Sequence, residues 1–229
     1  MDPFALKKLN AARRARKAAV LLTDLGDGRD RVIEEGDPLA GELGQAIARA
    51  MQSGTGEQTE IEGRTFFINP HLPEPRMVII GAVHISQILA PMARMAGFEI
   101  IIIDPRTAFA TEERFGGFTL YAEWPDEILK VNPLDRHTAL IAVTHDPKID
   151  DGPILAALKA DCVYIGALGS RKTHGSRVER LLAAGAKAHD ITRIKAPIGL
   201  NIGATGPAEI AVSILAEVIS AFRLRPKLP

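Results

Sequence analysis

From residue 77 onward the sequence alternates short apolar runs with segments of helical character. The apolar runs occupy residues 77–82, 98–103, 119–121, 139–143 and 162–165. The helical segments cover residues 84–95, 126–130, 154–159 and 173–184, with a last long helix expected from Pro207. Strands that lack polar alternation are typical of a parallel sheet covered by helices on both faces. The sequence therefore predicts an α/β domain built on a parallel sheet.

The residues before this region have a different pattern. They predict a basic amphipathic helix up to about Lys17, strands at 18–25 and 31–34, a helix at 38–51 and a hairpin around Gly63. Pro70, Pro73 and Pro75 then interrupt regular structure, because proline removes a donor and biases its predecessor away from helix. We expect a small N-terminal α+β domain over residues 1–70 and a larger domain over residues 76–229.

Composition excludes some classes of partner. The chain has 28 basic and 28 acidic side chains, so it lacks the net positive charge with which proteins bind nucleic acid or an anionic membrane. No apolar run approaches the roughly 18 residues of a membrane span, and the basic N-terminus lacks an apolar signal core. The single cysteine, Cys162, lies in an apolar run and is expected to be a buried, inert thiol. We expect a soluble cytoplasmic protein.

Three polar loops, at residues 144–148, 166–171 and 197–204, mark the expected site. The first two directly follow apolar runs that are predicted to be buried parallel strands. In an open α/β sheet, ligands bind outside the carboxyl ends of the strands. The chemistry of this chain is therefore expected at these loops.

The loop that begins at Thr144 holds a histidine, three carboxylates and a lysine within eight residues. Asp150 or Asp151 is expected to cap a helix that starts near Pro153. His145 and Asp146 are harder to explain by capping. They could bind a metal, act as acid and base, or hydrogen-bond a polar heterocycle; metal is the weakest of these, because no second His/Cys cluster is nearby in the sequence.

Residues 81–86 occupy the place where a dinucleotide-binding fold carries its glycine fingerprint, and Asp104 ends the next apolar run, where a ribose-binding carboxylate belongs. Val83 and Ser86 stand where the second and third glycines are normally found. The match is therefore weak, and a turn without a ligand explains the loop about as well. Arg106 could neutralise a phosphate or pair with a carboxylate such as Glu112 or Glu113.

The other two loops are rich in glycine and precede helices. Residues 166–177 combine Gly166 and Gly169 with the donors Ser170, Arg171, Lys172, Thr173 and Arg177. This set suits an anion at a helix N-terminus, although a capped helix with a solvated basic first turn fits equally well. Residues 199–204 carry little side-chain bulk, so backbone could approach a ligand closely there, or the glycines could serve simple turns.

Several of these segments, in the same order, carry a family resemblance. They are Gly81-Ala82-Val83-His84, Asp104-Pro105-Arg106, Thr144-His145-Asp146-Pro147-Lys148, residues 164–171 with Thr173-His174, and residues 197–200 through Pro207-Ala208-Glu209-Ile210-Ala211. Over roughly residues 75–222 the sequence resembles the Rossmann-like domain of the xanthine dehydrogenase accessory proteins, the XdhC/CoxI family. The resemblance implies a Rossmann-like fold and a protein that binds the molybdenum cofactor, a molybdopterin, and passes it to an apo molybdenum hydroxylase such as xanthine or carbon monoxide dehydrogenase.

On this interpretation the polar loops hold the pterin and its phosphate, with the cofactor in a form with or without a nucleotide. The expected cofactor-binding residues are Gly81, His84, Asp104, Arg106, Thr144, His145, Asp146, Lys148, Gly166, Gly169, Ser170, Arg171, Thr173, His174, Gly199, Asn201 and Gly203. No catalytic residue and no metal ligand is expected. A homodimer is expected on family grounds only.

The sequence departs from the family in one respect. Many longer members carry an N-terminal domain with a glycine-rich motif that contains cysteine, and the residues before Pro70 include neither that motif nor any cysteine. A companion chain could supply the motif, or this member could lack the step. Cys162 is no obvious substitute, because burial disfavours a reactive thiolate.

Three hypotheses follow. The leading one is a cofactor chaperone without turnover. The second is an oxidoreductase that uses NAD or NADP, with Asp104 or Arg106 at the ribose and His145 as proton donor. The third is a docking scaffold for the target enzyme whose site binds nothing.

Overall fold

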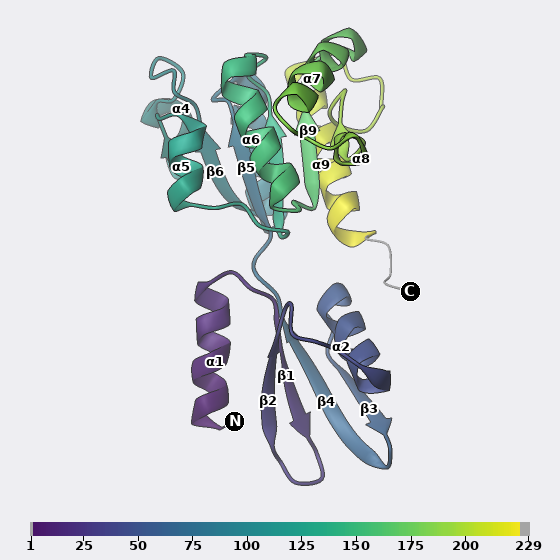
Figure 1. Ribbon diagram of the computed structural model, residues 1–229. Helices are drawn as coiled ribbons and strands as arrows, with labels where there is room; N and C mark the ends of the chain where they lie inside the picture. Colours follow the sequence, from purple (N-terminus) through teal and green to yellow (C-terminus); the bar gives the residue numbers. More distant parts are fainter. Residues whose placement is uncertain (1, 225–229) are drawn as a thin grey trace. The chain divides into compact units, whose positions relative to one another are not determined.

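The computed structural model describes residues 2–224, and the chain divides into two compact units, residues 2–73 and Glu74–Leu224 (Figure 1). The first unit is a four-stranded antiparallel sheet of strand order β2-β1-β4-β3 with two helices. Its elements are α1 (Pro3–Arg14), β1 (Ala19–Asp24), β2 (Asp30–Glu34), α2 (Gly41–Ser53), β3 (Glu57–Ile61) and β4 (Arg64–His71).

The two helices of the first unit pack on opposite faces of its sheet. Leu9 of α1 packs with Leu21 of β1, whereas Ile47 of α2 packs with Leu22 of β1 and Ile68 of β4. Neighbouring residues of a strand point to opposite faces, so β1 contributes to both clusters. This explains why β1 is apolar throughout most of its length.

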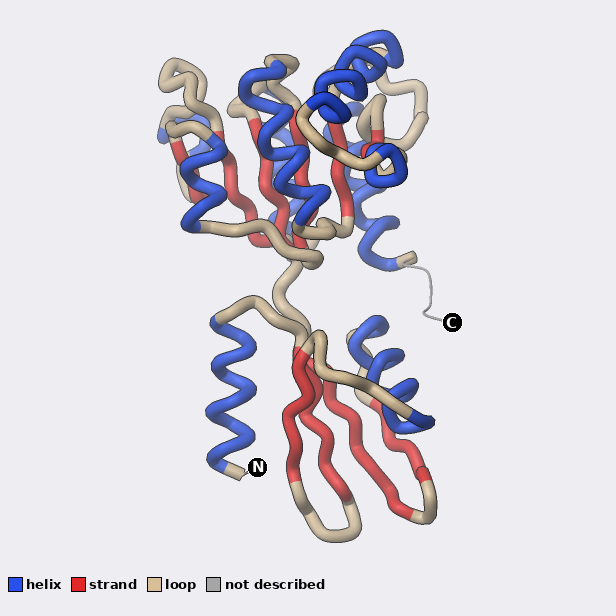
Figure 2. The backbone as a smooth tube through the Cα atoms, in the orientation of Figure 1, coloured by secondary structure: helices blue, strands red, loops and turns tan. Residues whose placement is uncertain are grey.

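The second unit is a six-stranded sheet in which all strand pairs are parallel. Its elements are β5 (Arg76–Ile80), α3 (His84–Met95), β6 (Glu99–Ile103), α4 (Glu112–Phe115), β7 (Thr119–Tyr121), α5 (Pro125–Val131), β8 (Thr138–Ala142), α6 (Pro147–Lys159), β9 (Tyr164–Ala167), α7 (Arg171–Ala183), α8 (Ala188–Ile191), β10 (Ile194–Lys195) and α9 (Pro207–Arg223). Figure 2 shows the strands side by side in red with helices in front and behind.

The strand order is β10-β9-β8-β5-β6-β7. Two runs of strands thus extend outward from the centre, as in the doubly wound order of a Rossmann fold. The chain leaves β5 in one direction to form β6 and β7, and then returns to the other side of β5 to form β8, β9 and β10. The α/β, Rossmann-like prediction is therefore confirmed, and β5 and β8 lie on either side of the switch point of the sheet.

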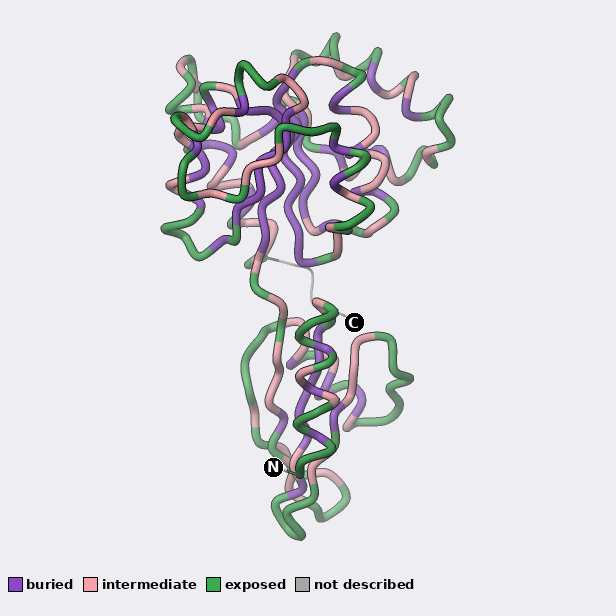
Figure 3. The backbone as a smooth tube through the Cα atoms, turned by 90° about the vertical axis from the view of Figure 1, so that its left-hand side faces the viewer, coloured by how far each residue is buried: buried purple, intermediate pink, exposed green. Residues whose placement is uncertain are grey.

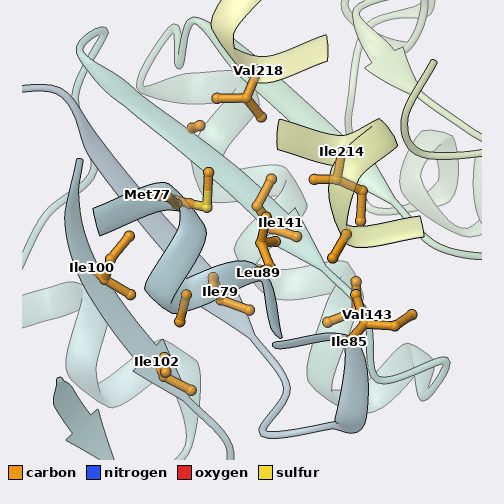
Figure 4. Packing of buried hydrophobic residues seen from close by; sticks show 14 of the residues in the cluster. Met77, Ile79, Ile85, Leu89, Ile100, Ile102, Ile141, Val143, Ile214 and Val218 are labelled. Carbon is orange, nitrogen blue, oxygen red and sulfur yellow. The ribbon is translucent and has the colours of Figure 1, made fainter. Parts of the chain in front are cut away.

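Burial on both faces explains the apolar runs. On one face Ile79 and Ile141 pack against Leu89 of α3 and Ile214 of α9 (Figure 4). On the other face Ile80 packs in a cluster with residues of α5, α6 and α7. Figure 3 shows the strands of this sheet as almost uniformly buried. Each fully buried Ile or Leu contributes about 1.5–3 kcal/mol relative to an exposed one, so this layer dominates the stability of the unit.

Most predicted elements are present, and the errors concern the starts of two helices and three short elements. The helix at 84–95 is confirmed as α3, and Pro207 is the first residue of α9 as predicted. The prediction for α6 was wrong at its start, because the helix begins at Pro147 rather than near Pro153. The prediction for α2 also began too early, since that helix starts at Gly41. The short elements α4, α8 and β10 were not predicted.

None of the helices among residues 2–224 is both long and apolar enough to cross a membrane. Cys162 is 1% exposed and lies just before β9 rather than within it. The expectation of a buried cysteine is therefore confirmed, and burial raises the pKa of its thiol to about 12.

Two glycines in the loop after β10 allow the packing of this loop against α9 to be tested. Gly199 has φ +88°, and a Cβ there would lie 3.0 Å from the backbone nitrogen of Ile214, besides meeting the side chain of Ser213. Gly203 in the same loop has φ +75°, but nothing lies within 4 Å of its would-be Cβ. We expect Gly199→Ala to lower the unfolding free energy by about 2–4 kcal/mol, because strain and overpacking add.

Gly203→Ala is the matched control, with an expected loss of about 1 kcal/mol from backbone strain alone. Urea denaturation of both variants measures the difference. Equal losses would mean that Gly199 is not constrained by its contact with α9.

Candidate functional site

The carboxyl ends of β5 and β8 meet at the switch point, and Gly81 and Thr144 lie there in contact. Gly81 has φ +119°, and a Cβ on it would lie 2.9 Å from Cγ2 of Thr144. A side chain at residue 81 would therefore push the two loops apart. The glycine at the fingerprint position is required by packing between the two central strands, whether or not a phosphate binds there.

A hydrogen bond within residues 81–86 stabilises the rest of the loop after β5. Ser86 is fully buried, and its hydroxyl donates a hydrogen bond of 2.6 Å to the carbonyl oxygen of Gly81. This bond uses a serine where a dinucleotide-binding loop normally has its third glycine. His84 is the first residue of α3 and is exposed to solvent.

Asp104 follows β6 where a ribose-binding carboxylate was expected, but its oxygens are already engaged. It is fully buried and accepts hydrogen bonds from the backbone N–H of Ala82 (2.7 Å) and from the guanidinium of Arg106 at Nε (2.8 Å) and Nη2 (2.7 Å). Burial acts to raise the pKa of Asp104, but the hydrogen bonds from Arg106 and Ala82 outweigh it and hold the pKa below its usual value. The carboxylate partner of Arg106 is thus Asp104 rather than Glu112 or Glu113.

The loop after β8 is organised around the start of α6. Asp146 is the N-cap, and its side chain accepts a hydrogen bond of 2.9 Å from the backbone N–H of Lys148, while Pro147 is the first helical residue. The prediction that Asp150 or Asp151 caps this helix was wrong, and the view that Asp146 does not serve as a cap was wrong as well. Proline at the first position and an Asx cap before it explain why the helix begins there.

His145 precedes the cap with φ +65°, a left-handed conformation that is uncommon for residues other than glycine. Its side chain is exposed, as is that of Lys148. Thr144 is buried, and its hydroxyl donates to Oδ1 of Asp150 (2.7 Å) and accepts from the backbone N–H of Asp146 (3.0 Å). Thr144 therefore fixes the loop to the first turn of α6.

The loop after β9 leads into α7. Gly166 lies inside β9 rather than in the loop, and a Cβ on it would lie 2.6 Å from the side chain of Ile198. Gly169 has φ +133° and faces Thr173. Ser170 is the N-cap of α7 and accepts a hydrogen bond of 3.2 Å from the backbone N–H of Thr173. The helix is thus capped as expected.

The remaining predicted residues differ in exposure. Arg171 is exposed on the first turn of α7, whereas His174 is partly buried, and burial together with the charge of Arg177 lowers the pKa of its ring. Asn201 and Gly203 are exposed in the loop between β10 and α9. No group of three or more His, Cys, Asp or Glu side chains within residues 2–224 is placed to hold a metal ion.

A pocket of about 280 Å³ lies between the starts of α6 and α7. It is lined by His145, Pro147, Asp150, Lys172, Thr173, Ser176, Arg177 and Arg180. Two of the predicted residues, His145 and Thr173, belong to this lining, and Thr144 lies behind it through its bond to Asp150. Gly81, Asp104 and Arg106 are instead at the ends of β5 and β6.

Two charged residues of the pocket are buried with polar atoms that have no partner among the described residues. Arg177 is 2% exposed; its Nη2 donates to the carbonyl oxygen of Leu168 (2.9 Å), but Nε and Nη1 are unpaired. Asp150 is 1% exposed, and its Oδ2 is unpaired although Oδ1 is bonded to Thr144. Unpaired buried polar atoms are rare in folded proteins and call for an explanation, of which a bound ligand is one.

The electrostatics of this pair follow from burial. Burial raises the pKa of Asp150 to about 6, although the hydrogen bond from Thr144 and the charge of Arg177 act in the opposite direction. Burial likewise lowers the pKa of Arg177, against the charges of Asp150 and Asp151. Unlike Arg177, Arg180 has a carboxylate partner, because Asp151 accepts hydrogen bonds from its Nε (2.6 Å) and Nη2 (3.2 Å).

Sequence reasoning placed Arg177 among the donors of a possible anion site at the start of α7, but neither Arg177 nor Asp150 was among the expected cofactor-binding residues. A signal was present in both cases. Arg177 lies four residues before the buried Leu181 of α7, and Asp150 lies four residues before the buried Ile154 of α6, so each is a charged residue on the apolar face of its helix.

Comparison with known proteins identifies the family of this domain. Residues 77–218 match the family model of the XdhC Rossmann domain. The chain belongs to the XdhC family. It is 35% identical over 154 residues to a protein of Bacillus subtilis that is named as a probable subunit of xanthine dehydrogenase, an alignment that covers 67% of this chain and 44% of that protein.

Two relatives come from Escherichia coli. The chain is 30% identical over 148 residues to the molybdenum cofactor insertion chaperone PaoD, covering 65% of this chain and 40% of PaoD. It is 31% identical over 172 residues to the uncharacterized protein YqeB, covering 70% of this chain and 30% of YqeB. The chain thus spans less than half the length of these relatives.

Among solved structures, a xanthine dehydrogenase from Bacillus halodurans superposes with a TM-score of 0.64. The superposition covers 97% of this XdhC chain and 65% of that chain at 23% sequence identity. At this identity the likeness concerns the fold.

The buried carboxyl of Asp150 gives a prediction for stability. Its folded pKa of about 6 lies above the ordinary value of 3.8, so the folded state binds a proton more tightly and its stability falls as pH rises from about 4 through 6. Asp150→Asn removes this penalty. We expect the variant to be more stable than the wild type at pH 8, by up to about 3 kcal/mol, and the difference to shrink toward pH 4.

Chemical denaturation of both proteins at pH 4.5, 6 and 8 measures the difference. A variant that is less stable than the wild type by the same amount at every pH would show that the Asp150 carboxyl is not destabilised by its burial.

Proposed function

We propose that this XdhC chain is a maturation factor that binds the molybdenum cofactor as cargo and passes it to an apo molybdenum hydroxylase, such as a xanthine or carbon monoxide dehydrogenase. The observation that carries the proposal is the pocket beyond the ends of β8 and β9, with its buried and unpaired Arg177 and Asp150. The name of the relative PaoD, a molybdenum cofactor insertion chaperone, supports this choice of cargo.

The residues at the strand ends fit such a cargo. A pterin ring presents both donors and acceptors, and its side chain ends in a phosphate. His145 and Thr173 line the pocket, and the first turn of α7 directs free backbone N–H groups toward an anion. We propose that the pterin lies over the 144–148 loop near His145 and Lys148, with its phosphate toward α7 near Ser170 and Arg171.

The other predicted binding residues take two kinds of role in this proposal. Gly81, Gly166 and Gly169 permit the close packing that brings the loops together, and Asp104 with Arg106 holds the loop after β5. Four residues of the neighbouring loops border the cargo, namely the exposed His84, Asn201 and Gly203 and the partly buried Gly199. We propose that the chain binds and protects the cofactor without turnover.

The oxidoreductase alternative has less support. Both oxygens of Asp104 accept hydrogen bonds from the protein itself, so the carboxylate is not free to accept one from a ribose hydroxyl. Ser86 is fully buried and Val83 partly so, at positions where a dinucleotide fold uses glycine. No observation among the described residues favours NAD or NADP over the pterin.

Delivery requires a partner surface for the apo-enzyme, and we propose that the protein acts in the cytoplasm as a homodimer. The residues before Pro70 contain no cysteine, and a companion chain that carries the cysteine motif of longer family members is part of the proposal.

The proposal predicts a loss of function without unfolding. His145→Ala and Arg171→Ala each remove an exposed polar side chain at the proposed site, so both variants should fold normally. Each lost contact to a charged ligand is worth about 1.5 kcal/mol, so activation of a co-expressed molybdenum hydroxylase should fall roughly tenfold. Lys159→Ala, at the opposite end of α6, is the control and should activate like the wild type.

Hydroxylase activity in extracts, normalised to the amount of hydroxylase protein, is the measurement. Full activation by both site variants would show that these loops do not hold the cargo.

A further inference from the structure

Arg177 and Asp150 carry opposite charges on neighbouring helices, yet they do not pair with each other. The Nη2 atom of Arg177 is bonded to the backbone of Leu168, and Oδ1 of Asp150 is bonded to Thr144. Within residues 2–224 nothing pairs with Nε or Nη1 of Arg177, or with Oδ2 of Asp150. Both residues line the same pocket.

The unpaired atoms of Arg177 and Asp150 destabilise the folded protein, and they indicate which chemical groups a ligand would have to offer. A buried charged group that lacks a partner carries a desolvation penalty, which a ligand relieves if it supplies the missing atoms. Arg177 requires acceptor oxygens for its unpaired N–H groups, which phosphate and carboxylate offer. Asp150 requires a hydrogen between its Oδ2 and the ligand. The ligand must therefore present acceptor oxygens, and the proton can come from the ligand or from Asp150 itself, since burial raises the pKa of Asp150 to about 6.

We propose that this pocket binds a phosphate monoester, with Arg177 donating to phosphate oxygens and a single proton shared between the phosphate and Asp150. No bond is made or broken. The capped first turn of α7, with Lys172 and Thr173, completes the surroundings of the phosphate. That the phosphate belongs to the molybdenum cofactor rests on the proposed function.

The shared proton sets the pH dependence of binding. The second pKa of a phosphate monoester is near 6, and burial raises the pKa of Asp150 to about 6, so either group can supply the proton. Sulfate and phosphate diesters carry no proton near neutral pH, so they depend on the protonated form of Asp150. The pocket should therefore discriminate against the state in which both partners are fully ionised, and binding should weaken above pH 6.

The other charged groups around Asp150 do not supply this discrimination. Lys172 and Arg180 of α7 attract any anion, and Arg180 is held by Asp151. His145 lies before α6, His174 lies on α7, Asp146 caps α6, and Arg106 acts from the loop after β6. Only Asp150 is both buried and open to a shared proton at Oδ2 among these described groups.

Pocket size adds a consequence for the cargo. About 280 Å³ is at the lower limit of small-molecule sites, so it accommodates a phosphate and a few attached atoms, and the pterin must lie outside. A cofactor form extended by a nucleotide has a diphosphate linkage in place of the terminal monoester. The pocket should accordingly favour the form without a nucleotide.

Binding of small probes to the whole chain tests the pocket. Calorimetry with ethyl phosphate, diethyl phosphate and sulfate at pH 6 and pH 8 would be applied to the wild type, Arg177→Met, Lys172→Met and Asp150→Asn. For the wild type we expect saturable binding of ethyl phosphate at pH 6, with sulfate and the diester as comparison anions. Its affinity should fall about tenfold or more by pH 8, because the shared proton is lost.

The variants separate the roles. Arg177→Met should lose at least tenfold in affinity for ethyl phosphate, whereas Lys172→Met, which removes the same charge from the lining, should lose threefold at most. In Asp150→Asn the affinity for ethyl phosphate should not fall from pH 6 to pH 8, because the shared proton at residue 150 is absent. Thermal unfolding confirms that each variant is folded.

An affinity of the wild type for ethyl phosphate that is the same at pH 6 and pH 8 would overturn the proposal, as would equal losses in Arg177→Met and Lys172→Met. Binding of intact molybdenum cofactor separates this proposal from the proposed function. If the wild type and Arg177→Met bind the cofactor equally, the phosphate pocket is wrong while the maturation role stands. If ethyl phosphate binds as predicted and the cofactor does not, the pocket stands and the choice of cargo is wrong.

Discussion

The pairing of β5 with β8 at the centre of the parallel sheet is the constraint on which the rest of the second unit depends. Both strands are fully buried, and every residue of β5 from Arg76 to Ile80 pairs with one from Thr138 to Ala142. Because parallel strands end on the same side, this register brings the loops after β5, β6, β8 and β9 to one edge. The contact between Gly81 and Thr144 then fixes how closely the two central loops approach.

The loops at this edge are stabilised unequally. Around Asp104 the polar groups are paired, since the carboxylate accepts hydrogen bonds from Arg106 and from the backbone of Ala82. Around Asp150 they are not all paired, since a carboxylate oxygen of Asp150 and two guanidinium nitrogens of Arg177 have no partner within the described structure. Strain and unpaired polar groups persist in folded proteins mainly where function requires them, and the left-handed backbone of His145 lies on the same side. The polar pocket of this XdhC domain is therefore between α6 and α7.

Sequence alone predicted the layers of the fold because its signals are local. Apolar runs such as residues 98–103 and the helix at 84–95 need no knowledge of their neighbours. The start of α6 was mispredicted because three carboxylates, Asp146, Asp150 and Asp151, compete as caps in sequence, and only the packing of α6 on the sheet decides among them. The pocket was only partly anticipated. His145 and Thr173 were selected from their loops, and Arg177 was counted as a donor near the start of α7. The burial of Arg177 and Asp150 could not be predicted, because it depends on which face of a helix is buried and on what lies across it.

The most direct test of the proposed role is whether the chain holds the molybdenum cofactor. Purified protein titrated anaerobically with molybdenum cofactor, and in parallel with NADH and NADPH, gives stoichiometry and affinity by calorimetry. We predict saturable binding of the pterin cofactor and no binding of either nicotinamide nucleotide. Saturable binding of NADH or NADPH without binding of the pterin would contradict the proposed role.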